Sequence, residues 1–202
     1  MLFAKLKLMQ SDPFLLLPVR ITRRKNIELA IEIVSELRQY FANPMLVVTG
    51  PPGPHNQDNQ NYFRELLRLR NQLGLDPARN VASGVHFMAE VYDGVLPVEL
   101  VHDFFRMADG ILFPSFEEGF GIPMIEAGMA GVPIFASEIT SLKAIGQEQA
   151  TWFAPNGNPA EIARQIKDRL CTDPTFVLKK RIRQNFIWEG VFEKHISPLL
   201  EF

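Results

Sequence analysis

The chain has 202 residues, of which 47% are hydrophobic and 22% are charged, and its formal net charge is -2. This balance is typical of one soluble globular domain and offers no excess positive charge for a nucleic-acid backbone, so we expect no nucleic-acid partner. The single cysteine excludes an internal disulfide, and no apolar run reaches the roughly 20 residues that span a bilayer.

The first twelve residues carry two lysines in a short apolar stretch, without the apolar core and cleavage site of a signal peptide. We therefore expect residues 1–12 to be a tail or linker, and the protein to be cytoplasmic. Residues 14–20 form an apolar run that predicts a buried strand, although Pro18 should limit its pairing. Apolar residues at helical spacing over 27–41 predict a helix with one buried face.

Two more strands are predicted in the middle of the chain, at residues 45–50 and 85–88. A helix over residues 63–73 separates them, and Gly74 is placed to end it. Pro97 suits the first turn of a further helix, which should run towards Ala108.

The last part of the chain predicts three strands, at residues 110–115, 132–137 and 151–154. A short helix over about 123–130 follows the first of them. Asn158 and Asp173 each precede a proline, and such pairs combine a side-chain cap with a first-turn proline, so a helix should begin at each.

Continuously apolar strands separated by amphipathic helices predict a parallel sheet of about six strands with helices on both faces. Right-handed crossovers then give a doubly wound, Rossmann-like α/β fold, which we assign to residues 13–188. In such a sheet, ligands bind beyond the carboxyl ends of the strands. The binding chemistry is therefore expected in the loops that follow the strands.

The most informative stretch is residues 109–133, where a strand leads into a glycine-bounded turn and the turn leads into a helix. Gly119 and Gly121 have no Cβ, so a ligand can approach the main chain around Phe120 closely. The helix that begins near Ile122 offers unpaired N–H groups and the positive end of its dipole. This turn is a candidate diphosphate site.

Two carboxylates flank the turn. Glu126, about one turn into the helix, can accept hydrogen bonds from the hydroxyls of a ribose, and Glu118 can reach a sugar on the far phosphate. One alternative is a plain tight turn with two solvated glutamates, but the strand, turn, helix and spaced carboxylates coincide. Another is a glycosidase with an acid and a nucleophile, which the phosphate-binding surroundings disfavour.

Glu118 and Glu126 are separated by seven residues within the pattern Pro-Ser-x-x-Glu-Gly-Phe-Gly-x-Pro-x-x-Glu-Ala-x-x-x-Gly-x-Pro. This pattern resembles the signature of the glycosyl transferases group 1 family, a large family of retaining glycosyltransferases with the GT-B fold whose members include sucrose-phosphate synthases. The resemblance extends over about residues 14–200. It implies that the chain is the C-terminal, donor-binding domain of such an enzyme, one half of a GT-B fold.

The family has a second element, an arginine and a lysine after the first strand, which Arg20 and Lys25 match. By resemblance, Arg20 and Lys25 hold the donor diphosphate and act with Glu118 as catalytic residues. Two cations at a strand end can stabilise the charge that develops on a leaving phosphate. The alternative is a solvated basic cluster at a helix start, and this is what we expect of Arg23 and Arg24.

The third element is the loop after residues 85–88, where the family receives the nucleotide base largely through main-chain groups. Met88, Ala89 and Glu90 are the candidates, and the base itself is not readable from them. His86 lies within a strand, and no pair of histidines has the spacing of a metal site. We expect no metal and no cofactor, the donor being a substrate.

The resemblance implies transfer of a hexose from a nucleoside-diphosphate sugar to an acceptor hydroxyl with retention. Such enzymes work in a cleft between two Rossmann-like domains, so we expect the isolated chain to be inactive without an N-terminal acceptor-binding domain. Residues 189–202 should form a helix that packs on that domain, and any peripheral membrane contact should come through it. The alternative is a stand-alone nucleotide or nucleotide-sugar binding module.

Overall fold

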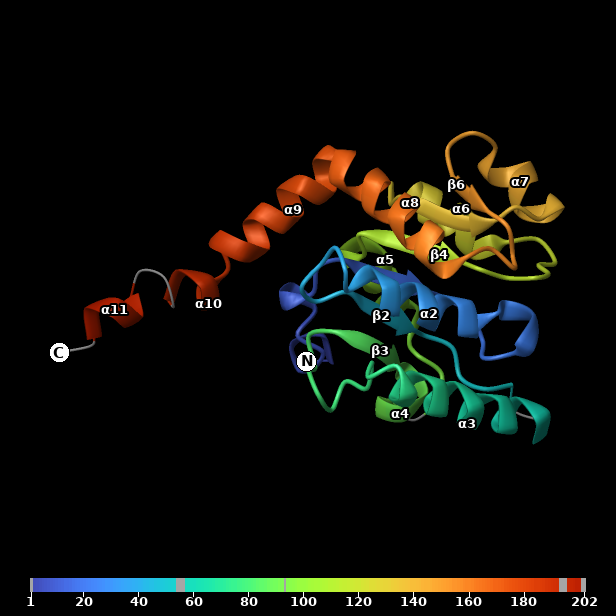
Figure 1. Cartoon of the computed structure of the whole chain (residues 1–202), viewed down its shortest axis with the longest axis horizontal. Coiled ribbons are helices and arrows are strands. Elements are labelled where there is room, and N and C mark those ends of the chain that lie inside the picture. Colours follow the sequence, from blue (N-terminus) through green and yellow to red (C-terminus); the bar gives the residue numbers. More distant parts are fainter. Residues whose placement is uncertain (1, 54–56, 93, 193–195, 201–202) are drawn as a thin grey trace.

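Six parallel strands form the centre of the computed structural model, which describes residues 2–53, 57–92, 94–192 and 196–200 (Figure 1). The strands pair in the order β3–β2–β1–β4–β5–β6. They are β1 (Phe14–Leu17), β2 (Met45–Val48), β3 (Gly84–Phe87), β4 (Gly110–Phe113), β5 (Ile134–Ser137) and β6 (Thr151–Phe153). The predicted doubly wound, Rossmann-like sheet is confirmed, with β1 and β4 adjacent at its middle.

Helices cover both faces of the sheet (Figure 1). One face carries α2 (Ile27–Leu37), α3 (Gln57–Gln72) and α8 (Pro159–Thr172), and α2 packs between the other two. The opposite face carries α5 (Val98–Met107) and α6 (Ile122–Met129), with α7 (Thr140–Gly146) beside α6. Because both faces are covered, every residue of β1 to β4 is buried, which explains why the strands are continuously apolar.

Local signals set the ends of several elements. The first strand is shorter than predicted, because Pro18 cannot donate to the sheet and the Val19 N–H turns back to Leu17 O at 3.0 Å. The two predicted caps are confirmed. Asn158 accepts the Ala160 N–H at the start of α8, and Asp173 caps α9 (Pro174–Asn185) by accepting two N–H groups.

Residues 2–12 pack against the domain, whereas the sequence led us to expect a tail or linker. They form α1 (Leu2–Lys5) and a 3₁₀ helix, η1 (Leu8–Gln10), and both Leu6 and Leu8 are buried in the hydrophobic core. The Phe3 ring lies edge-on to Phe104 of α5, with centroids 4.9 Å apart. This short apolar stretch therefore covers the sheet face that carries α5.

The C-terminal segment leads away from the sheet (Figure 1). We expected one helix over residues 189–202, but the described part holds two short ones, α10 (Trp188–Val191) and α11 (Ser197–Leu200). Residues 193–195 and 201–202 lie outside the described residues. Trp188, Leu199 and Leu200 are exposed. Nowhere in the described ranges is there a helix with the length and apolarity to cross a membrane.

Candidate functional site

The loops after β1 and β4 meet at the carboxyl edge of the sheet, and a buried ion pair joins them. Lys25 lies at the end of a 3₁₀ helix, η2 (Arg23–Lys25), and is only 8% exposed. Its Nζ donates to Oε1 and Oε2 of Glu118 at 2.6 and 2.5 Å, and Ser115 Oγ donates to Oε1 at 2.7 Å. The sequence-predicted Lys25 and Glu118 are thus brought into direct contact.

Main-chain contacts hold the same two loops together. The Phe116 N–H donates to Arg24 O at 2.9 Å, and Arg24 Nη1 donates to Glu117 O at 3.3 Å. Asn26 has the left-handed backbone angles φ 51 and ψ 49, and its Nδ2 donates to Pro114 O at 3.0 Å and to Pro155 O at 2.8 Å. One buried amide therefore ties the loops after β1, β4 and β6 to each other.

The environment of Lys25 sets its acid–base behaviour. Burial lowers the pKa of the ammonium, while the hydrogen bond and the charge of Glu118 act in the opposite direction. Burying a charged pair has a desolvation cost that is repaid only by close, hydrogen-bonded geometry. An anion that enters beside Lys25 would meet a largely desolvated cation, where electrostatic attraction is stronger than in water.

The turn before α6 is open to solvent. Gly121 caps α6 with φ 87, a conformation that favours glycine, and a Cβ there would lie 2.9 Å from Leu142 Cδ2. A Cβ on Gly119 would meet nothing within 4 Å, and Phe120 and Ile122 are exposed. Gly119 and Phe120 are therefore open to solvent, whereas Gly121 at the N-terminus of α6 is buried.

Glu126 lies one turn into α6 and is half-buried. Among the described residues, no hydrogen bond or ion pair engages its carboxylate, in contrast to Glu118. Arg20 follows β1 and is exposed. Its main chain lies against a residue just after β2, because a Cβ on Gly50 would lie 2.7 Å from Arg20 Cα. Both side chains are available to a ligand.

The two remaining arginines of the basic cluster differ from each other. Arg23 turns away to Glu65, with Nη2 2.7 Å from Oε2, and stacks over the Tyr62 ring at 4.8 Å. Arg24 stays at the site, with Nη1 3.8 Å from Glu118 Oε2. Arg23 is thus exposed and paired on α3, whereas Arg24 adds positive charge next to the buried pair.

Comparison with known proteins identifies the family. The family model described as "Glycosyl transferases group 1" matches residues 2–186. The chain belongs to this family. The serotype-specific mannosyltransferase WbdA of Escherichia coli is 29% identical over 170 residues, which is 82% of this chain and 18% of that protein.

Solved glycosyltransferases share the fold. Sucrose-phosphate synthase from Thermosynechococcus elongatus has a TM-score of 0.66 at 24% identity, over 94% of this chain and 45% of that one. The C-terminal domain of the group 1 protein LpcC from Francisella tularensis has a TM-score of 0.63 at 21% identity, over 94% and 92%. The chain therefore spans less than half of the first two proteins and nearly all of the isolated C-terminal domain.

The loop after β3 forms a four-residue helix, α4 (Met88–Val91). Met88 is buried and Ala89 is half-buried. The Glu90 carboxylate is held by the guanidinium of Arg70, from the last turn of α3. Of the three candidate residues for binding the nucleotide base, Glu90 therefore has its carboxylate already engaged by Arg70.

Sequence reasoning missed Arg70. It lies among polar residues near the end of α3. Its spacing carried a signal, because Tyr62, Leu66 and Arg70 recur every four residues and are the buried positions of the helix. An arginine on a buried helical face needs partners, and Arg70 finds them in Glu90, in Asp76 at 3.9 Å and in the Val85 carbonyl at 3.4 Å.

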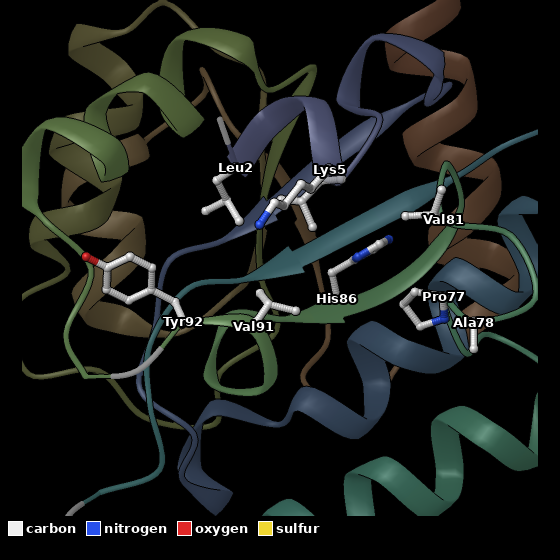
Figure 2. A pocket seen from close by; sticks show the side chains of 9 residues that line it. Leu2, Lys5, Pro77, Ala78, Val81, His86, Val91 and Tyr92 are labelled. Atoms are coloured by element: carbon white, nitrogen blue, oxygen red, sulfur yellow. The ribbon is translucent and has the colours of Figure 1, made fainter.

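A cavity of about 620 Å³ lies beside the edge strand β3, between α1 and α4 (Figure 2). Lys5, His86, Val91 and Tyr92 contribute to its wall, and none of the candidate donor-site residues does. His86 is 4% exposed, its Nε2 has no hydrogen-bond partner, and burial lowers its pKa to about 4. Within the described ranges, no group of three or more His, Cys, Asp or Glu side chains is arranged to hold a metal ion.

Proposed function

We propose that the chain is the donor-binding domain of a retaining glycosyltransferase, which transfers a hexose from a nucleoside-diphosphate sugar to an acceptor hydroxyl. The observation that carries the proposal is the contact between Lys25 and Glu118 beside the open start of α6. A buried cation, an adjacent carboxylate and an accessible glycine turn are what a phosphate-linked sugar requires.

We propose a place for the donor from these positions. Its diphosphate lies against the turn at Gly121 and between Arg20 and Lys25, so that the positive end of the α6 dipole and two cations face the phosphates. The carboxylate of Glu126 is free to accept the ribose hydroxyls, and Glu118 faces the transferred sugar. The base extends towards the main chain of Met88 and Ala89 at the end of β3.

The chemistry is the departure of a nucleoside diphosphate from the anomeric carbon. Negative charge builds up on the leaving phosphate, and Lys25, Arg20 and the N-terminus of α6 are fixed electrostatic stabilisers of that charge. Retention follows if the acceptor attacks from the face that the phosphate leaves, with a phosphate oxygen taking the acceptor proton. The chain supplies this charge stabilisation from its own residues, so we propose no resident cofactor.

The rest of the active site comes from an acceptor-binding domain. The chain spans 18% of the mannosyltransferase and 45% of the sucrose-phosphate synthase that it resembles, so those proteins contain much more than this domain. We propose that such a domain closes over the Lys25–Glu118 edge and brings the acceptor. We place the activity in the cytoplasm, consistent with Cys171 being free and exposed.

Isothermal titration with UDP, GDP and ADP tests the site in the isolated chain. We expect one of them to bind, and Glu126→Ala to weaken it by about 1.5–3 kcal/mol, since charge-assisted bonds to the ribose are lost. Glu148→Ala, an exposed carboxylate beyond α7, is the matched control and should leave the affinity unchanged. A folded sample that binds none of the three nucleotides contradicts the proposal.

A further inference from the structure

The buried guanidinium of Arg70, in the last turn of α3, forms an ion pair with the more exposed carboxylate of Glu90 in the short helix α4. Arg70 Nη2 lies 3.1 Å from Glu90 Oε1, and Nη1 bonds the other carboxylate oxygen. Arg70 is 5% exposed, and its guanidinium lies 5.7 Å from the centroid of the Phe87 ring. A two-pronged contact of this kind fixes orientation as well as distance.

Apart from this ion pair, α4 is held by apolar contacts. It has four residues, of which Met88 is buried and Val91 is 54% exposed. Val91 and Tyr92 border the cavity of about 620 Å³, so one side of the α4 segment faces open space (Figure 2). The α4 segment is therefore held by apolar packing of Met88, Ala89 and Tyr92 against the core and by one polar anchor, the Glu90 carboxylate.

We propose that Arg70 is a positioning residue for the nucleotide base: by gripping Glu90, it fixes the main chain of Met88 and Ala89 that contacts the base. This inference rests on the proposed function, in which those main-chain groups receive the base. Main-chain recognition selects a base only if the N–H and C=O groups stay in one place, because each hydrogen bond weakens steeply with misalignment. Arg70 thus acts on base selection through Glu90 without touching the ligand.

A positioning role and a purely structural role predict different effects on nucleotide affinity when the Arg70–Glu90 ion pair is lost. UDP, GDP and ADP share the ribose and diphosphate, which Glu126, Lys25 and the Gly121 turn hold at a separate place. If the pair only stabilises the fold, its loss should weaken all three nucleotides alike or none of them. If it positions α4, its loss should weaken the preferred nucleotide most and reduce the difference between the three.

The test compares three conservative variants by titration with UDP, GDP and ADP, after a thermal melt shows that each is folded. Glu90→Gln keeps the shape of the carboxylate and lies on an exposed residue, so it should fold even if a change at Arg70 does not. Arg70→Lys keeps the charge but loses the planar fork. Arg68→Lys, on an exposed position of the same helix, is the matched control.

We expect Glu90→Gln and Arg70→Lys to reduce the ratio of the tightest to the weakest affinity by at least fivefold, and Arg68→Lys to leave it unchanged. An equal loss for all three nucleotides, an unchanged ratio, or a wild type that does not discriminate among them overturns the role of Arg70. A wild type that binds no nucleotide refutes the proposed function itself, so the two failures are distinguishable.

Discussion

The ammonium of Lys25 lies 2.5 Å from Oε2 of Glu118, a residue 93 positions further along the chain. Two residues that the sequence assigns to the donor site therefore neutralise each other. In the proposed function, a donor phosphate has to compete with Glu118 for the same ammonium. Because of this competition, removing the cation and removing the carboxylate should change the affinity for a nucleoside diphosphate in different directions.

We expect Lys25→Met and Glu118→Gln to have opposite consequences for nucleoside diphosphate binding. Lys25→Met removes the cation that faces the phosphate and should weaken binding by at least tenfold, about 1.4 kcal/mol or more. Glu118→Gln releases Lys25 from its competitor, so the affinity for a diphosphate without a sugar should stay the same or rise. Isothermal titration measures both affinities.

Lys143→Met is the control for this comparison, because Lys143 pairs with Glu138 at 3.1 Å on the surface of α7. It should bind nucleotides like the wild type. If Glu118→Gln lost as much affinity as Lys25→Met, the Glu118 carboxylate would contribute directly to nucleotide binding. The prediction that Glu118 competes with the phosphate for Lys25 would then be wrong.

Asn26 should reveal how much its left-handed backbone and its amide each contribute to stability. Asn26→Gly keeps φ 51 accessible and loses only the bonds to Pro114 O and Pro155 O, at a cost of about 1–2 kcal/mol in the free energy of unfolding. Asn26→Ala loses the same bonds and adds backbone strain of about 1 kcal/mol. Urea denaturation should therefore rank wild type above Gly and Gly above Ala, and a reversed order of the two variants would rule out the strain.

His86 should make the domain less stable in mild acid. Burial lowers its pKa from 6.5 to about 4 in the folded chain. As the pH falls, His86 is therefore protonated near pH 6.5 in the unfolded chain but only near pH 4 in the folded chain. This contribution to stability is complete above pH 6.5 and declines as the pH falls, by about 3 kcal/mol in all.

The His86→Gln variant isolates this contribution from the titration of the carboxylates. The difference in unfolding free energy between wild type and variant should shift in favour of the variant as the pH falls from about 7 to about 4. Nearby charges act on His86 in both directions, since Arg70 lowers its pKa and Asp76 raises it. A difference that is constant with pH would show that His86 titrates normally in the folded chain.

Arg183 should be the main attachment of α9 to the sheet. Its Nη1 lies 2.6 Å from Oδ2 of Asp109, whose side chain is fully buried, and the same oxygen accepts the Phe14 N–H at 2.8 Å. Arg183→Met leaves a buried carboxylate without its cation and should cost about 3–5 kcal/mol of unfolding free energy.

Arg181→Met, an exposed position on the same helix, provides the comparison and should change stability by less than about 0.5 kcal/mol. Urea denaturation of the two variants under identical conditions measures the difference. Equal stabilities would mean that the Asp109 carboxylate finds sufficient partners without Arg183.

The sequence by itself determined the parallel sheet, the helix starts at Asn158 and Asp173, and the turn that leads into α6. These features depend on the local spacing of apolar residues, on capping residues a few positions away, and on glycines within one continuous motif. All of these signals come from residues that are close together in the sequence. The candidate residues Lys25 and Glu118 could be named because they match motifs of the family that the sequence resembles, and each follows a predicted strand.

Only the tertiary structure decided which of these residues meet. The crossovers place β1 beside β4, and this adjacency puts Lys25 on Glu118 and the Asn26 amide between three loops. The pairing of Arg70 with Glu90 and the burial of Leu6 and Leu8 arise in the same way. A buried charge or an apolar stretch requires a partner, but its local sequence does not say which one, because the partner is fixed by the packing of the whole chain.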